Sequence, residues 1–426
     1  MPSVPPPAPL GRVLLVSHNF PPTQGPESAL VRINTLDLLQ RGWRVSVLTT
    51  EMEHFHQTID HGMLAGLPAE LEVIRTPSYD ATLRKRWGRF GTLIIILLRN
   101  WLVPEVFFLW LLSSVPAGKR WLRHNGPAII YSRATKHVSN VAGWMLKKAT
   151  GLPWIAHFSD PWQASSYLNP FQTWIAEWLE RRIFRDADAI IIVNGNLYGS
   201  FAAIHPVAKD KIHVIPHGYE PLEHPPAPSE NVGRRPMQAI HAGSFIPDTR
   251  EPDVLFQGLA LLNKRLPLQG LLQLTCVGAD TTRYQAMADE LGVGGFVSLL
   301  ESIPYQQCQD MVARSDLLMV LDTPDQGGIY LPTKLIEYLP YDKPVLGVAE
   351  KGSAVHRVLE HCDLNFADQH SPEDIANVFE GLLRQWQAGT WSVSALTRER
   401  VLDYRIDRVN GKLHELLTQL SRTLPA

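Results

Sequence analysis

Apolar residues near the N-terminus fall into two kinds of run. Residues 12–17 form a short run with a continuous apolar centre, and residues 42–49 form a short run rich in Trp, Val and Leu; both are typical of buried parallel strands. Between them, residues 28–40 show the periodicity of an amphipathic helix. The loop at 21–27 joins the first strand to this helix. The pattern therefore predicts a strand–loop–helix–strand unit whose loop lies at the carboxyl end of a strand, where parallel sheets bind ligands.

The same alternation continues along the chain. In the first half we expect strands at 128–132, 153–158 and 189–194 and helices at 139–148 and 171–184. In the second half we expect strands at 238–245, 272–278, 316–321 and 345–348, and a closing helix at 397–420. A chain of 426 residues with this pattern is long enough for two Rossmann-like α/β domains, each with its own core.

A change of composition separates the two predicted domains. Residues 221–235 are rich in Pro, Glu and Arg and have no apolar periodicity, so they are predicted to form the linker. The expected organisation is an N-terminal domain at 1–220, a C-terminal domain at 236–396 and a closing segment at 397–426.

The segment 87–121 contains two strongly apolar runs, at 92–98 and 106–112, interrupted by Arg99, Pro104 and Glu105. This broken run fits poorly to a spanning helix, which needs about 20 mostly apolar residues. A helix lying on a membrane surface is favoured by the basic and tryptophan residues in and around it: Arg84, Lys85, Arg86, Arg89, Trp87 and Trp101. Two buried helices of the first domain would explain the pattern equally well.

Polar residues follow the predicted strand at 153–158. His157, Ser159 and Asp160 lie where a parallel strand ends, which is a usual place for reacting groups in an open α/β sheet. We therefore take His157 and Asp160 as candidate catalytic residues. A turn-capping role for Asp160 before Pro161 is the alternative.

The most informative segment is 331–339, in which Lys334 precedes Glu337 by three residues near a predicted helix start. Backbone N–H groups there, the helix dipole and Lys334 would attract phosphate oxygens, and Glu337 could accept hydrogen bonds from sugar hydroxyls. These features suit a diphosphate linked to a ribose. An amphipathic helix with both charges in solvent would fit the same pattern.

The order around this segment is a strand, a loop, Pro332-Thr333-Lys334, a helix, the turn Lys343-Pro344 and another strand. It closely resembles the donor-binding segment of family 4 glycosyltransferases of the GT-B fold, of the bacterial cell-surface polysaccharide type. The resemblance extends over nearly the whole chain, through the motifs at 20–26, 42–49, 160–162 and 214–220. It implies two Rossmann-like domains that face each other across a cleft, with the C-terminal helix crossing back to the first domain.

The resemblance also implies roles for individual residues. Gly243, Ser244 and Arg250 match the turn and basic residue that hold the donor's phosphates. Thr333, Gly352 and Ser353 belong to segments expected to face the donor, and Gly25 and Pro26 to the acceptor-binding loop. Gly25 would let the backbone approach a substrate closely, although a plain Pro/Gly turn explains the loop as well.

The chain departs from the family pattern in a few places. The first of two glutamates usual in the family, which lies near the transferred sugar, would fall on Ile329, while the second matches Glu337. At the end of the first domain His217 and Glu220 replace the usual Asn and Asp. Because only some branches of the family lack the first glutamate, its absence here restricts the resemblance to those branches.

Composition narrows the possible partners. Forty basic and 42 acidic residues give a formal charge of −2, which provides no overall field for nucleic acid. The three scattered cysteines, without a C-x-x-C pair, suit a reducing compartment, and the N-terminus has no signal-peptide pattern. We therefore expect a cytoplasmic protein, which the membrane-surface interpretation of residues 87–121 would place at the inner face of the membrane. The histidines at 54, 56 and 61 lack metal-ligand spacing, so no metal is expected.

The predicted function is that of a retaining, metal-independent glycosyltransferase of the hexosyltransferase type, with no cofactor. It would move a sugar from a UDP- or GDP-sugar to a saccharide or lipid-linked acceptor. Arg250 and Lys334 would stabilise the departing diphosphate. A nucleotide-sugar epimerase of the same architecture and a catalytically silent sugar-nucleotide-binding subunit are the alternatives.

Overall fold

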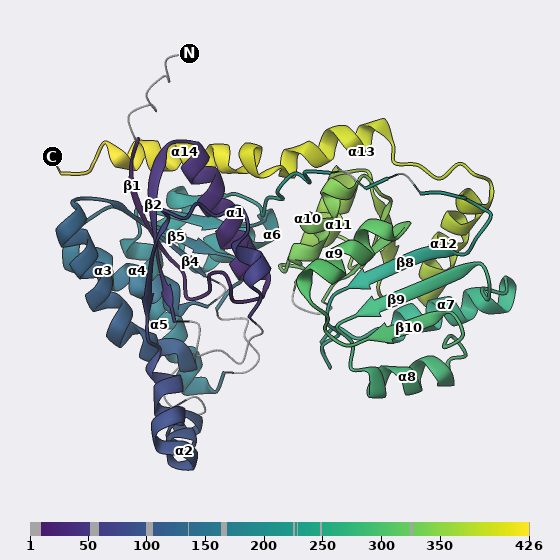
Figure 1. Ribbon diagram of the computed structural model, residues 1–426, viewed down its shortest axis with the longest axis horizontal. Helices are drawn as coiled ribbons and strands as arrows, with labels where there is room; N and C mark the ends of the chain where they lie inside the picture. Colours follow the sequence, from purple (N-terminus) through teal and green to yellow (C-terminus); the bar gives the residue numbers. More distant parts are fainter. Residues whose placement is uncertain are drawn as a thin grey trace. The chain divides into compact units, whose positions relative to one another are not determined.

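The computed structural model of the chain describes residues 10–51, 59–98, 105–134, 136–162, 168–224, 226–227, 229–247, 249–323 and 327–425. The chain forms two compact units: unit 1 is residues 1–216 with 406–426, and unit 2 is residues 217–405. Each unit is a parallel sheet covered by helices on both faces (Figure 1). The chain enters unit 2 after Pro216, and the segment predicted as a linker lies within unit 2.

Unit 1 contains a sheet of seven strands in the order β3-β2-β1-β4-β5-β6-β7, and every pair is parallel. The strands are β1 (Gly11–Val16), β2 (Trp43–Thr50), β3 (Glu72–Thr76), β4 (Ile129–Ala134), β5 (Trp154–Phe158), β6 (Ala189–Ile192) and β7 (Ile212–Val214). Short connections that return through helices keep all strands in one direction, as in doubly wound α/β folds.

The helices of unit 1 are α1 (Pro26–Gln40), α2 (Tyr79–Leu97), α3 (Leu111–Asn125), α4 (Val138–Thr150), α5 (Pro170–Asp186), α6 (Gly195–Ile204) and α14 (Ile406–Ser421). Among the described residues, 3₁₀ helices also occur at η2 (His61–Leu64), η4 (Val106–Trp110) and η5 (Pro206–Lys211). The expected strands and helices of this half are present, with ends shifted by a few residues.

Alternation along the strands builds two cores in unit 1. Leu14 and Val16 of β1 join the core formed with α3, α4, α5 and α6. Val13 and Leu15 point to the other face, where α1 and α14 cover the sheet. Since both faces are buried, the strand reads as a continuous apolar run in the sequence.

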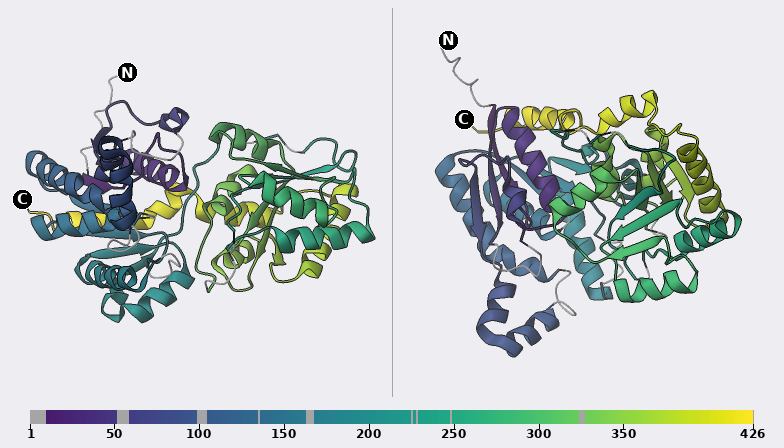
Figure 2. Two further views of the ribbon diagram at one scale, coloured as in Figure 1. Left: turned by 90° about the horizontal axis from the view of Figure 1, so that it is seen from below. Right: turned by 45° about the vertical axis from the view of Figure 1, so that its right-hand side comes forward.

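The C-terminal helix α14 lies beside α1 and packs on the first sheet (Figures 1 and 2). Asn410 Nδ2 donates to Asp37 Oδ2 of α1 at 3.0 Å, and Trp43 Nε1 donates to His414 Nδ1 at 3.1 Å. The predicted return of the chain to the first domain is therefore confirmed. The single predicted helix at 397–420 is wrong in detail, because it divides into α13 (Ala395–Arg400), η7 (Val401–Tyr404) and α14, with Arg405 in extended conformation between them.

The apolar segment 87–121 has two different environments. Trp110 and Trp121 are buried in the core of unit 1, as the interpretation with buried helices predicts. Helix α2 instead protrudes from the unit, with a break at Gly88, whose φ is 52° (Figure 1). Residues 99–104, including Trp101, lie outside the described residues. Within the described ranges, no helix is both long and apolar enough to cross a bilayer.

Unit 2 contains a sheet of six parallel strands in the order β10-β9-β8-β11-β12-β13. The strands are β8 (Met237–Ala242), β9 (Leu272–Val277), β10 (Val297–Leu300), β11 (Leu317–Leu321), β12 (Val345–Ala349) and β13 (Asn365–Asp368). Its helices are α7 (Asp253–Arg265), α8 (Thr281–Glu290), α9 (Tyr305–Arg314), α10 (Thr333–Tyr338), η6 (Leu339–Tyr341), α11 (Ala354–His361), α12 (Pro372–Gln387), α13 and η7.

The second sheet is also buried on both faces. One core joins Ala239 and Met319 to α7, α8 and α12. The other joins Ile240 and Leu318 to α10 and α11. Both cores hold the carboxyl ends of β8 and β11 next to each other, where the loops after these strands begin.

Each sheet has one point at which the strand order reverses. In unit 1 it lies between β1 and β4, and in unit 2 between β8 and β11. Loops leaving the carboxyl ends of two such strands diverge to opposite faces and leave room for a ligand. A ligand site is therefore expected at each of these two edges.

Candidate functional site

In unit 2, the turn after β8 combines a small residue with a cation. Arg250 Nε donates to the carbonyl oxygen of Ser244 at 3.1 Å, and the backbones of Ile246 and Arg250 bond each other in both directions at 2.8 Å. Burial lowers the pKa of Arg250, and the charge of Asp322 acts against this shift. The guanidinium is thus anchored at one nitrogen beside Gly243 and Ser244.

His241 explains why residue 243 has no side chain. A Cβ at Gly243 would lie 3.1 Å from His241 Nε2. His241 Nδ1 lies 3.1 Å from the carbonyl oxygen of Met319, which can only accept, so Nδ1 carries the proton of the neutral ring. Burial lowers the pKa of His241 to about 4, and the charges of Arg250 and Lys334 also disfavour protonation. The neutral imidazole of His241 therefore packs directly against the backbone at Gly243.

Lys334 and Glu337 pair with each other on α10. Lys334 Nζ lies 2.7 Å from Glu337 Oε2 and 5.8 Å from the centre of the Tyr305 ring. Burial acts to lower the pKa of Lys334, but the negative charge of Glu337 outweighs it and raises the pKa above its ordinary value. Lys334 is therefore a stable cation, and both side chains remain partly exposed to solvent.

Tyr338 fixes α10 to the end of β8. Its hydroxyl accepts a hydrogen bond from the N–H of Ala242 at 2.9 Å, and its side chain is buried. Ala242 directly precedes Gly243, and Tyr338 directly follows Glu337. This single bond places the helix with Lys334 and Glu337 against the turn with Gly243 and Ser244. Thr333 is the first residue of the same short helix.

The loop after β12 completes this edge. Ser353 caps α11 by accepting from the N–H of His356 at 3.1 Å, and Gly352 has a φ of 84°. The N–H of Ala354 donates to the carbonyl oxygen of Gly328 at 2.7 Å, which joins this loop to the one before α10. The neighbouring Asp325 and Gln326 lie outside the described residues.

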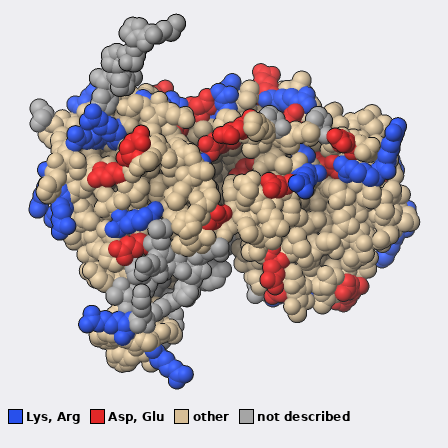
Figure 3. Space-filling model, viewed as in Figure 1, with Lys and Arg blue, Asp and Glu red and all other residues tan. Residues whose placement is uncertain are grey.

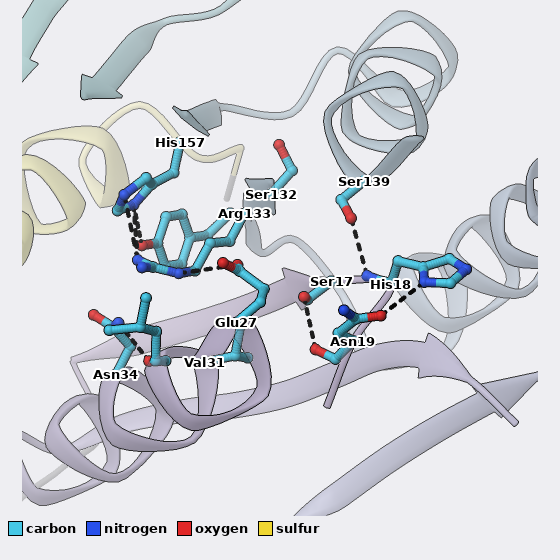
Figure 4. Close-up of polar contacts among 12 residues, drawn as sticks. Ser17, His18, Asn19, Glu27, Val31, Asn34, Ser132, Arg133, Ser139 and His157 are labelled. Atoms are coloured by element: carbon cyan, nitrogen blue, oxygen red, sulfur yellow. Dashed lines mark hydrogen bonds and ion pairs between the residues drawn. The ribbon is translucent and has the colours of Figure 1, made fainter. Parts of the chain in front are cut away.

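In unit 1, a buried charged network occupies the corresponding edge (Figure 4). Arg133 Nε of β4 lies 3.2 Å from Glu27 Oε1 of α1, and Arg133 Nη1 lies 3.1 Å from His157 Nδ1 of β5. The hydroxyl of Tyr131 contacts the same His157 nitrogen at 2.8 Å. His157 is therefore a buried partner of a cation, held by neighbouring strands of the sheet.

Asp160 lies in the loop after β5, near this network. Burial, together with the negative charge of Glu27, raises the pKa of Asp160 to about 6. A carboxyl group with such a pKa can gain or lose a proton near neutrality, as general acids and bases do.

Gly25 and Pro26 begin α1. Gly25 has a φ of 142°, which strongly favours glycine, and a Cβ there would meet nothing within 4 Å. Pro26 occupies the first turn, where no N–H is needed. The backbone at Gly25 therefore borders open space next to Glu27.

The predicted residues thus fall into two groups, one in each unit. Gly243, Ser244, Arg250, Thr333, Lys334, Glu337, Gly352 and Ser353 surround the reversal point of the second sheet, and Gly25, Pro26, His157 and Asp160 lie at that of the first. Glu27, Arg133, His241 and Asp322 were not predicted. Glu27, Arg133 and Asp322 each lie next to the end of a predicted helix or strand, which is the one signal that pointed to them, whereas His241 lies within a predicted strand.

The described residues contain no group of three or more His, Cys, Asp or Glu side chains able to hold a metal ion. His54 and His56 lie outside the described residues.

Solved structures share this architecture over both units. Sucrose-phosphate synthase from Thermosynechococcus elongatus is 16% identical with a TM-score of 0.65, and the match covers 97% of this chain and 100% of that one. HepE of Anabaena, in complex with UDP and glucose, is 14% identical with a TM-score of 0.63, covering 96% and 99%. The lipopolysaccharide outer core galactosyltransferase WaaB is 16% identical with a TM-score of 0.57, covering 96% and 99%. Curated protein sequences gave no match.

Two Rossmann-like units, with the C-terminal helix returned to the first, define the GT-B fold of glycosyltransferases. Residues 36–218 match a family profile described as the glycosyl transferase 4-like domain. The match over residues 36–218 and the shared GT-B fold agree with the sequence resemblance to family 4 glycosyltransferases.

Proposed function

We propose that the protein is a retaining glycosyltransferase of the hexosyltransferase type. It transfers a sugar from a UDP- or GDP-sugar to a saccharide or lipid-linked acceptor in cell-surface polysaccharide synthesis. The observation that carries this proposal is the pair of cations, Arg250 and Lys334, at the reversal point of the second sheet beside the side-chain-free turn at Gly243. The complex of HepE with UDP and glucose, in the same fold, supports a nucleotide-sugar donor.

In the proposed donor complex the diphosphate lies against Arg250 and Lys334. Arg250 is anchored through Nε, so its terminal nitrogens can bind phosphate oxygens as a pair. Glu337 accepts hydrogen bonds from the ribose, and Thr333, Gly352 and Ser353 contribute backbone and hydroxyl groups. Because guanidinium and ammonium groups supply the positive charge, the reaction is proposed to proceed without a metal ion or cofactor.

The proposed reaction breaks the bond between the anomeric carbon and the diphosphate oxygen. Negative charge grows on the departing diphosphate, where preorganised cations stabilise it most in the transition state. The acceptor hydroxyl attacks from the same face, forms the new glycosidic bond and gives its proton to the departing phosphate. Unit 1 binds the acceptor at Gly25 and Pro26, with Asp160 and His157 orienting its hydroxyl group.

The test is transfer by purified protein from UDP- and GDP-sugars to a panel of lipid-linked and free saccharides. Arg250→Ala and Lys334→Ala should each lose roughly two to three orders of magnitude in turnover. Arg314→Ala is the matched control, because Arg314 is an exposed cation at the end of α9. Near-normal turnover in both site variants would contradict the assignment. A sugar whose configuration changes without any acceptor would favour an epimerase, and donor binding without turnover would favour a silent subunit.

We also propose that α2 attaches the protein to the inner face of the membrane. After the break at Gly88, Phe90, Leu93 and Leu97 recur at helical spacing and are 61%, 56% and 58% exposed. Trp87 stacks on Phe90 with ring centres 5.8 Å apart. Arg86 and Arg89 lie in the same helix, and basic side chains are visible at its protruding end (Figure 3). Apolar side chains beside cations suit an anionic lipid surface.

Vesicle co-sedimentation tests this attachment. The protein should bind vesicles of phosphatidylglycerol and phosphatidylethanolamine at low salt, and binding should weaken with added salt. Phe90→Ser with Leu93→Ser should abolish binding, whereas Val207→Ser should not, because Val207 is a single exposed apolar residue on η5 (80% exposed). Failure of the unmodified protein to bind at low salt would refute the attachment.

A further inference from the structure

Asp322 is a buried carboxyl group at the reversal point of the second sheet that the proposed donor contacts leave unused. It is the first residue after β11, and β11 lies next to β8, with Met319 opposite His241 in the register. Only 3% of Asp322 is exposed. An aspartate is rarely buried to this extent unless its carboxylate is paired or hydrogen-bonded.

The two oxygens of this carboxyl group differ in their hydrogen bonds. The N–H of Thr323 donates to Oδ1 at 2.8 Å. Oδ2 is buried, and no donor of the described residues reaches it with good hydrogen-bond geometry, although the Ser353 hydroxyl and the Glu350 N–H lie near enough to stabilise the carboxylate. Buried polar atoms are almost always hydrogen-bonded, so an unsatisfied carboxylate oxygen indicates a place for a ligand's donor group.

The surroundings determine which ligand group fits. Burial raises the pKa of Asp322 to about 6, while the Ser353 hydroxyl and the N–H groups of Thr323 and Glu350 act against this shift. Asp322 is therefore largely a carboxylate at neutral pH, and a carboxylate can only accept hydrogen bonds. It would repel a phosphate and attract a hydroxyl group.

Arg250 provides the complementary group. The negative charge of Asp322 acts to raise the pKa of Arg250, so the two side chains lie in the same region, although no ion pair joins them among the described residues. Arg250 Nε is occupied by the Ser244 carbonyl, which holds the guanidinium in place. The guanidinium of Arg250 and the carboxylate of Asp322 therefore fit a ligand that carries both an anionic group and a hydroxyl group.

We infer that Asp322 recognises a hydroxyl group of the transferred sugar, so that this site takes a glycosyl phosphate with its phosphate toward Arg250 and a sugar hydroxyl toward Asp322. The inference rests on the proposed function and adds a residue that determines sugar specificity. Asp322 acts by accepting a hydrogen bond and forms no covalent bond to the sugar.

The experiment compares the affinities of UDP, GDP, UDP-glucose and GDP-mannose for the protein and for Asp322→Asn, by isothermal titration calorimetry. For the sugar nucleotide that the unmodified protein prefers, the variant should lose about tenfold to a hundredfold in affinity, because a hydrogen bond to a charged group is lost. Affinity for the corresponding nucleoside diphosphate should stay unchanged. Glu350→Gln is the matched control, since it removes a neighbouring negative charge and should preserve both affinities.

Deoxy analogues of the preferred sugar nucleotide separate recognition from a structural role. One deoxy position should weaken binding to the unmodified protein and have no effect on Asp322→Asn. Equal losses for nucleotide and sugar nucleotide in the variant, or full affinity for every deoxy analogue, would overturn the inference while leaving the proposed function intact. If the unmodified protein bound none of the four probes, the proposed function itself would fail.

Discussion

Removing the hydrogen bond between Tyr338 and Ala242 is a defined perturbation of the proposed donor site in unit 2. Tyr338→Phe keeps the buried ring and removes only the hydroxyl that accepts from the N–H of Ala242 at 2.9 Å. In the variant this N–H would remain buried without an acceptor. The perturbation therefore acts on the contact between α10 and the turn at Gly243.

The expected cost follows from the burial of the orphaned group. Leaving a buried donor unsatisfied costs about 1–3 kcal/mol of the free energy of unfolding. For a unit of this size each kcal/mol lowers the midpoint of thermal unfolding by roughly 2–4 °C. The affinity for a sugar nucleotide should also fall, because Lys334 and Glu337 would no longer be held against Gly243 and Ser244.

The assay is urea and thermal unfolding of the two proteins, followed by titration with a sugar nucleotide. Tyr341→Phe is the control, since the hydroxyl of Tyr341 donates to the side chain of Gln309, which is exposed enough to find water instead. We expect Tyr338→Phe to be clearly less stable than Tyr341→Phe. Equal stability of the two variants would refute the reasoning that this hydroxyl positions α10.

Three further predictions concern both units. Gly25→Ala should cost about 1–2 kcal/mol of stability, because φ at Gly25 is 142°, and should raise KM for the acceptor without changing donor affinity; an unchanged acceptor KM would count against this. Glu337→Gln should weaken donor binding about tenfold and lower the pKa of the Lys334 ammonium, as NMR titration would report, since Glu337 Oε2 lies 2.7 Å from Nζ. Affinity for the sugar nucleotide should fall as pH drops through about 6, where Asp322, facing Arg250, Ser353 and Glu350, takes up a proton; Asp322→Asn should lack this dependence. Since folding raises this pKa, Asp322 should also reduce stability as pH rises toward 6, with no further change above it.

The central strands of both sheets were predictable because they are buried on both faces. Residues 12–17 and 316–321 are continuous apolar runs that correspond to β1 and β11. The strands β3, β7, β10 and β13 were missed. They are the edge strands of the two sheets and mix polar with apolar residues, so no clear period distinguishes them from loops.

The candidate site was predictable only where its residues are close in sequence. The spacing of Lys334 and Glu337 suggested a joint role, and their ion pair follows from that spacing on one helical face. Glu27 and Arg133, by contrast, are brought together by the sheet from distant segments. Asp322 is likewise buried beside Ser353 and Glu350 of the loop after β12, and no local pattern reveals this contact.

The most direct test of the account is a crystal structure of the protein with a bound UDP- or GDP-sugar. The account predicts that the diphosphate contacts the terminal nitrogens of Arg250 and the ammonium of Lys334, next to Gly243. A diphosphate bound elsewhere on the protein, or one that contacts neither cation, would contradict it.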